Sequence, residues 1–131
     1  KFYKVKELGV VITDSRLLPL RAGVVGIALG YAGFKGVRDY RGKKDLFGRQ
    51  FEYSRTDVAD SIATAAVLEM GEGSEQKPLA IITDVSDIEF IKEEYMPKTK
   101  DDTFEINDKE DMFYPFLSSV KWVKGGGGKN Q

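Results

Sequence analysis

The sequence contains no cysteine and no histidine. Without cysteine there is no disulfide scaffold and no thiol nucleophile, and without histidine there is no imidazole general base and no Ser-His-Asp triad. The usual ligands of a structural zinc site are missing as well. Any chemistry must therefore use carboxylates, hydroxyls, lysine, arginine or a bound metal ion.

An excess of charge of one sign and a long apolar run are also missing. The chain has 20 Lys and Arg against 21 Asp and Glu, a net charge of −1, which supplies no general attraction for nucleic acid. No apolar run approaches the ~20 residues that cross a bilayer. We therefore expect no nucleic-acid partner, no membrane segment and a cytoplasmic location, with any anion site being local.

The composition is that of a globular protein. Of the 131 residues, 41% are hydrophobic and 31% are charged, and this length suits one domain but not two independent cores. We expect a single domain over residues 1–124 and a flexible glycine-rich tail over 125–131. The chain begins with Lys1 and not with Met, so we expect a fragment of a longer protein.

Two short apolar runs predict buried strands, at residues 8–13, ending at Asp14, and at 79–83. Residues 17–36 contain glycine at a density that disfavours a helix and predicts strand and turns. The residues expected at the core of that strand are Val24, Val25, Ile27 and Leu29.

The clearest helix covers residues 57–70, which are rich in alanine and carry apolar residues at helical spacing. Ser54 and Asp57 have capping-box spacing, and Gly71 provides a C-terminal stop. The alanine-rich face lets another backbone approach closely. Because one clear helix separates several strands, we expect an α+β fold with a mostly antiparallel sheet and this helix packed on it.

The remaining segments are more polar. Residues 35–49 hold six basic residues in fifteen and predict a polar loop or hairpin. Residues 88–95 are expected to be helical, and residues 98–111 to form a surface loop or short helix.

Glycine clusters do not match known nucleotide fingerprints. After Gly125–Gly128 and Lys129, Asn130 stands where a phosphate-binding loop requires Ser or Thr. Gly23, Gly26 and Gly30 have the wrong spacing for a dinucleotide motif. Structural glycine and a flexible terminus are the better interpretations.

Two acidic sites are candidates for metal binding. Asp14 and Ser15 place a carboxylate beside a hydroxyl after a predicted strand, a hard-oxygen pair for Mg²⁺ or Mn²⁺. In the loop at 70–77, glycines flank Glu72, so backbone amides could face an anion while the carboxylate faces a metal. An ordinary turn and an ordinary solvated loop are the respective alternatives.

Basic residues in the 35–49 segment are candidates for contacts with phosphate or carboxylate groups, because arginine can bind two oxygens at once. The alternative is a solvated surface loop with internal Asp–Arg pairs. The residues concerned are Arg38, Arg41, Lys43, Lys44 and Arg49.

Together these segments form an ordered series that resembles the gamma-glutamyl ligases that elongate coenzyme F-420, from about residue 8 to residue 90. The matching blocks are TDSR at 13–16, GF at 33–34, DYRGKKDLFGR at 39–49, DVADSIATAA at 57–66 and MGE at 70–72, followed by Pro78. The resemblance implies GTP as co-substrate, Mn²⁺ or Mg²⁺, and L-glutamate joined to the carboxylate of an anionic small-molecule acceptor, coenzyme F-420 or folate-like. It also implies an intertwined homodimer with the active site near the interface, and an N-terminal half to which nothing here corresponds.

The resemblance also assigns individual residues. Asp14 is similar to the family's metal-binding Asp, Ser15 falls where the family often has Thr as a neighbouring ligand, and Glu72 stands where a metal-contacting Gln is common. From their chemistry and not from the resemblance, basic residues such as Arg41 or Lys43 are expected to hold anionic substrate groups. The family's nucleotide-contacting loop corresponds to Met70, Gly71, Glu72, Gly73, Ser74, Glu75, Gln76 and Lys77.

Two other functions stay open at this stage. The chain could be a noncatalytic nucleotide- or metal-binding fragment, or a structural half that acts only when paired with a missing N-terminal segment. It could also be a hydrolase that uses the same metal site, although the basic loop and the Glu72 loop suit a triphosphate and an anionic acceptor better than water alone.

Overall fold

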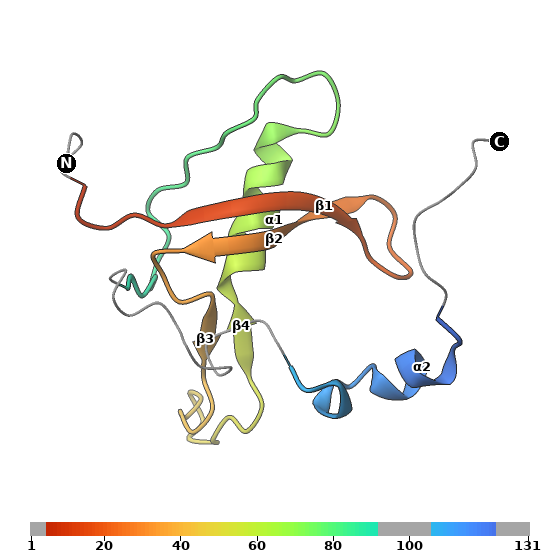
Figure 1. The fold of residues 1–131 in the computed structure, drawn as a ribbon. Helices are drawn as coiled ribbons and strands as arrows, with labels where there is room; N and C mark the ends of the chain where they lie inside the picture. The colour runs from red at the N-terminus through yellow and green to blue at the C-terminus, as the bar shows by residue number, and fades with distance from the viewer. Residues whose placement is uncertain (1–4, 92–105, 123–131) are drawn as a thin grey trace.

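The computed structural model describes residues 5–91 and 106–122. Within them, two antiparallel two-stranded sheets and one long helix form the main body (Figure 1). This confirms the expected α+β class. The elements are β1 (Val10–Leu17), β2 (Val24–Ala32), β3 (Val37–Asp39), β4 (Arg55–Asp57), α1 (Val58–Met70), a 3₁₀-helix (Asp108–Glu110) and α2 (Tyr114–Ser119).

The first strand is longer and more exposed than expected. It was predicted to be buried and to end at Asp14, but β1 continues to Leu17 because its polar half pairs with β2. Only one face of this hairpin is covered by α1, so burial alternates along the strand. Ile12 is 64% exposed, whereas Thr13 is half-buried.

The second strand carries a bulge. Ile12 pairs with Gly30 and Thr13 with Ala28, which leaves Leu29 as an extra residue in β2. Of the four residues expected at the core, Val24 and Leu29 are exposed, and the other two are only half-buried. The small residues Gly26 and Ala28, which precede the bulge in the sequence, face the helix instead.

The close packing of α1 on β2 centres on Gly26. A Cβ at this position would lie 2.6 Å from Val67 Cγ2 and 2.8 Å from the carbonyl carbon of Ala63. The Thr64 hydroxyl donates to the Gly26 carbonyl at 2.7 Å, and Ala63 is fully buried. The alanine-rich face therefore receives another backbone, as predicted.

Both ends of α1 are capped. Gly71 ends the helix with φ 80°, and its amide donates to Val67, as expected. At the start, the cap is Asp57, whose side chain accepts from the Asp60 amide at 2.9 Å, and not Ser54. The cap therefore lies three residues after the predicted one, and one Asp side chain supplies it. Burial raises the pKa of Asp57.

Asp60 joins the helix to the hairpin. Its Oδ1 accepts from the part-buried amide of Ala28, the residue before the bulge, at 2.8 Å. Asp60→Ala leaves this part-buried amide unpaired, and we expect a loss of about 1–3 kcal/mol in the free energy of unfolding. Urea denaturation measures it.

Asp60→Asn is the matched control because its amide oxygen can still accept the hydrogen bond. We expect Asn to retain most of the stability. Equal stability of wild type, Asp60→Ala and Asp60→Asn would contradict the role given to this bond.

The segment after the 70–77 loop forms no strand. Residues 79–83 were predicted to be a buried strand, but they pair with no other described strand, and Leu79 and Ile81 are 78% and 84% exposed. The expected helix at 88–95 is also wrong over residues 88–91. There Phe90 forms a bridge with Phe34, while Ile91 donates to the Gly33 carbonyl.

The remaining expectations have mixed outcomes. The polar loop or hairpin predicted at 35–49 is part of a longer hairpin, whose second strand β4 lies beyond the predicted range. The 3₁₀-helix lies at the end of the expected polar loop, and residues 92–105 and the tail at 125–131 lie outside the described residues. No helix in the described part of the chain is long and apolar enough to cross a membrane.

Candidate functional site

The first candidate site joins β1 to the loop after α1. The Ser15 hydroxyl donates to Glu72 Oε1, although the two residues are 57 positions apart. Ser15 pairs with Gly26 in the hairpin and faces α1, and Glu72 directly follows the helix-ending Gly71. The packing of the hairpin on α1 and the end of the helix at Gly71 therefore bring a hydroxyl and a carboxylate oxygen together.

Asp14 lies beside this pair, in mid-strand and not at a strand end. Its Oδ1 accepts from the Ser15 amide at 2.8 Å. Because successive residues in a strand point to opposite faces, the side chains of Asp14 and Ser15 diverge. Across residues 5–91 and 106–122, no group of three or more acidic residues is placed to hold a metal ion.

The donor set nevertheless suits a divalent cation. Carboxylate and hydroxyl oxygens are the ligands that Mg²⁺ and Mn²⁺ prefer. The side-chain oxygens of Ser15 and Glu72 already lie within hydrogen-bonding distance of each other. Two or three oxygens fall short of a complete coordination shell. Further ligands would have to come from water, phosphate or another segment.

The loop at 70–77 presents a backbone amide to an anion. The Gly73 amide donates to Glu75 Oε2 at 2.7 Å, and the Glu75 carboxylate lies against Gly71. Within this loop, one backbone amide is therefore satisfied by a carboxylate of the same loop. Binding of a nucleotide by the loop stays a prediction.

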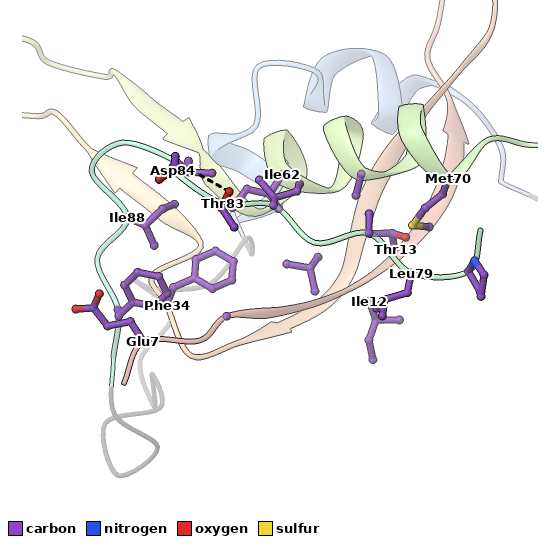
Figure 2. Close-up of a pocket in the computed structure, with 18 residues that line it drawn as sticks. Glu7, Ile12, Thr13, Phe34, Ile62, Met70, Leu79, Thr83, Asp84 and Ile88 are labelled. Atoms are coloured by element: carbon purple, nitrogen blue, oxygen red, sulfur yellow. Dashed lines mark hydrogen bonds between the residues drawn. The ribbon is translucent and has the colours of Figure 1, made fainter. Parts of the chain in front are cut away.

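An apolar cavity of about 670 Å³ lies between β1, α1 and the segment 78–90. Figure 2 shows Thr13, Met70 and Leu79 at one end, next in sequence to the Ser15–Glu72 region, and Phe34 near the other end. Sequence reasoning missed this cavity. Its signal was the apolar run at 79–82, which forms no strand and of which Leu79, Ala80 and Ile82 line the cavity.

The basic residues of the β3–β4 hairpin are held mainly by internal contacts. Arg41 binds Asp39 through Nη2 at 2.5 Å, and Arg49 binds Asp45 through Nε at 2.9 Å. The Arg41 contact lowers the pKa of Asp39 to about 2. For these two arginines the alternative of internal Asp–Arg pairs is therefore confirmed.

Arg38 and Lys43 make different contacts. Arg38 donates to the carbonyls of Ser86 and Asp87 at 2.9 and 2.7 Å, which fixes the segment 85–89 against β3. Lys43 lies over the ring of Tyr40, 5.4 Å from its centroid. Both line a polar groove, described below, whereas Arg49 does not.

The structure does not bring the acidic and basic candidates together. The Ser15–Glu72 pair lies near the C-terminal end of α1, and β3 and β4 lie near its N-terminal end (Figure 1). With 13 residues, α1 separates them by roughly 20 Å at 1.5 Å per residue. One chain therefore has two separate polar regions.

Known proteins with similar sequences are ligases. Relatives named coenzyme F420:L-glutamate ligase include those of Methanothermobacter thermautotrophicus and Archaeoglobus fulgidus, each 46% identical over 77 residues, which is 59% of this chain and 31% of the relative. The relative of the same name from Methanosarcina barkeri is 37% identical over 100 residues, 73% of this chain and 39% of its own length.

The chain also matches a sequence model of a protein family. The model described as F420-0:Gamma-glutamyl ligase matches residues 3–84, more than half of the chain. The chain belongs to this family, which confirms the resemblance seen in the sequence. It spans about a third of the length of the first two relatives.

Proposed function

We propose that this chain is part of a γ-glutamyl ligase, which joins L-glutamate to a carboxylate of an anionic acceptor related to coenzyme F420. GTP would be the co-substrate, with Mn²⁺ or Mg²⁺. The observation that carries the proposal is the Ser15–Glu72 contact beside a loop whose Gly73 amide faces a carboxylate. Family membership supports the reaction class.

The chemistry suits a chain without cysteine and histidine. A carboxylate is a poor electrophile, so the terminal phosphoryl group of GTP would first be transferred to an acceptor carboxylate oxygen, giving an acyl phosphate and GDP. The amine nitrogen of L-glutamate would then attack the carbonyl carbon. The new C–N bond replaces the C–O bond to phosphate, and the nitrogen loses a proton.

The residues of this chain would act through position and charge. A bound divalent cation would neutralise phosphate oxygens. The oxygens of Ser15 and Glu72 would hold it, and Asp14 would join them once its side chain has turned from the opposite face of β1. The Gly73 amide would donate to a phosphate oxygen once the Glu75 carboxylate has turned away. Such preformed donors stabilise developing charge without reorganising during the reaction.

A second candidate function is a nucleotide- and metal-binding segment that is not catalytic by itself. It is favoured by the incomplete set of acidic ligands within the described ranges 5–91 and 106–122. Further ligands would then come from another segment or, in a homodimer, from a second copy.

The decisive assay measures glutamate addition. The protein is incubated with GTP, Mn²⁺, L-glutamate and coenzyme F420, and the acceptor is analysed by mass spectrometry for an added glutamyl residue. We expect GTP-dependent addition that falls at least about 10-fold in Asp14→Ala, since changes even in groups around metal ligands cost this much.

Glu110→Ala is the matched control, because Glu110 is an exposed carboxylate in the 3₁₀-helix. Its activity should equal that of wild type. Metal-dependent GTP binding without any glutamyl product would support the second candidate and count against ligation by this chain.

A further inference from the structure

A polar groove lies between β3 and the segment 85–89, with a volume of about 410 Å³. Here it is called the basic groove. Five cationic and three acidic side chains line it, so it carries a formal surplus of two positive charges. They are Lys35, Arg38, Arg41, Lys43 and Arg55, with Asp39, Asp87 and Glu89.

The ion pairs in the basic groove leave this surplus in place. Lys35 pairs with Glu89 at 2.7 Å, and Arg41 pairs with Asp39. Arg38 donates mainly to neutral groups, the carbonyls of residues 86 and 87 and the Tyr40 hydroxyl at 3.2 Å.

Two further cations face the same space. Lys43 contacts an aromatic ring, and Arg55 lies near Asp39, whose charge Arg41 already balances. Asp87, the remaining carboxylate, offsets only one of Arg38, Lys43 and Arg55. The groove therefore matches a ligand group with two negative charges.

The position of the groove restricts which ligand can fill it. It lies near Val58 at the start of α1, roughly 20 Å from the Ser15–Glu72 pair at the other end of the helix. L-Glutamate is too short to reach from the groove to a phosphoryl group held there. A nucleotide whose phosphates lie at the 70–77 loop could extend only its neutral nucleoside this far.

We propose that the basic groove binds a dianionic group of the acceptor, either a phosphate ester or paired carboxylates, at the end remote from the carboxylate that is extended. The proposal rests on the proposed function, because it assumes an acceptor that reacts near Glu72. The acceptor must then be elongated, with an anionic group about one helix length from its reacting end.

The first test titrates the 131-residue chain with inorganic phosphate, glutarate and L-glutamate, without GTP or metal, and follows backbone amide NMR shifts. We expect at least one dianion, phosphate or glutarate, to shift amides of β3, β4 and residues 85–89. Lys43→Gln combined with Arg55→Gln should weaken that binding about 10-fold or more, the cost of losing charge-assisted hydrogen bonds.

Controls separate charge from fold. Lys43→Arg keeps the charge and should retain binding, and Lys109→Gln removes a cation from the 3₁₀-helix, away from the groove, and should bind as wild type. Dispersed wild-type-like spectra establish that each variant is folded. No binding of either dianion, shifts confined to residues 70–77, or equal affinity in the double variant would overturn the proposal.

The second test separates this proposal from the proposed function. In the ligation assay, Lys43→Gln with Arg55→Gln should raise the KM for the acceptor about 10-fold while the KM for GTP stays unchanged. Ligation with an unchanged acceptor KM overturns the groove assignment alone. Dianion binding without any ligation overturns the proposed function. It also overturns the assignment of the groove's ligand to an acceptor, which rests on that function. Tighter binding of L-glutamate than of glutarate would assign the groove to the donor amino acid instead.

Discussion

Replacing Gly26 by alanine is expected to remove about 2–3 kcal/mol from the free energy of unfolding. The added Cβ would meet the backbone of Ala63 and the Val67 side chain, at 2.8 Å and 2.6 Å for the nearest carbons quoted above. Backbone cannot move aside as a flexible side chain can, so α1 must shift from the hairpin. That shift also strains the hydrogen bond from Thr64 to the Gly26 carbonyl.

The same substitution at Gly30 is the control for this effect. Gly30 lies in the same strand, and a Cβ there would have nothing within 4 Å. Gly30→Ala should therefore be neutral or slightly stabilising, since alanine has less freedom in the unfolded chain. Urea denaturation of both variants decides the matter, and equal midpoints would show that the helix does not rest on Gly26.

The second large effect is expected at Glu72. Glu72→Ala removes the carboxylate that Ser15 contacts, and we expect metal-dependent GTP binding to weaken at least about 10-fold. Calorimetric titration with GTP and Mn²⁺, separately and together, measures this, with ATP as the comparison nucleotide.

Two further variants make the Glu72 test specific. Glu72→Gln keeps an oxygen donor and installs the residue common in the resembling ligases, so it should retain more binding than Ala. Glu69→Ala removes an exposed carboxylate from the last turn of α1 and should have no effect. Equal loss in Glu69→Ala and Glu72→Ala would point to net charge and not to a ligand.

The helix α1 could be predicted from the sequence because its signals are local. Alanine content, apolar spacing and the stop at Gly71 all lie within the helix or next to it. The exact cap was harder, because Ser54 and Asp57 both have suitable side chains and only the path of β4 into the helix selects Asp57.

Strand predictions failed where they depended on distant partners. The polar half of β1 is a strand because β2 supplies its hydrogen bonds, while the more apolar residues 79–83 have no partner strand among the described residues. Apolar composition alone does not tell these cases apart. The basic groove was missed for the same reason, since Arg38 joins β3 to carbonyls 48 and 49 residues away.

The Ser15–Glu72 pair illustrates what a family resemblance adds. Composition identified each residue only as a candidate with an ordinary alternative, and nothing local joins positions 57 residues apart. The ordered blocks placed both in one site, and the structure brings their oxygens together. The roles of these oxygens still await the binding experiments.

The bulge at Leu29 has a consequence for how the hairpin could vary in length. In a regular ladder, Val25, Ile27 and Leu29 would share one face of the hairpin. The extra residue reverses this, so that Gly26 and Ala28 meet α1. Leu29 is thus the one position in β2 at which a residue could be deleted while every cross-strand pair is preserved. A deletion between Val24 and Ile27 would turn a branched side chain toward a helix backbone that leaves little room at Gly26.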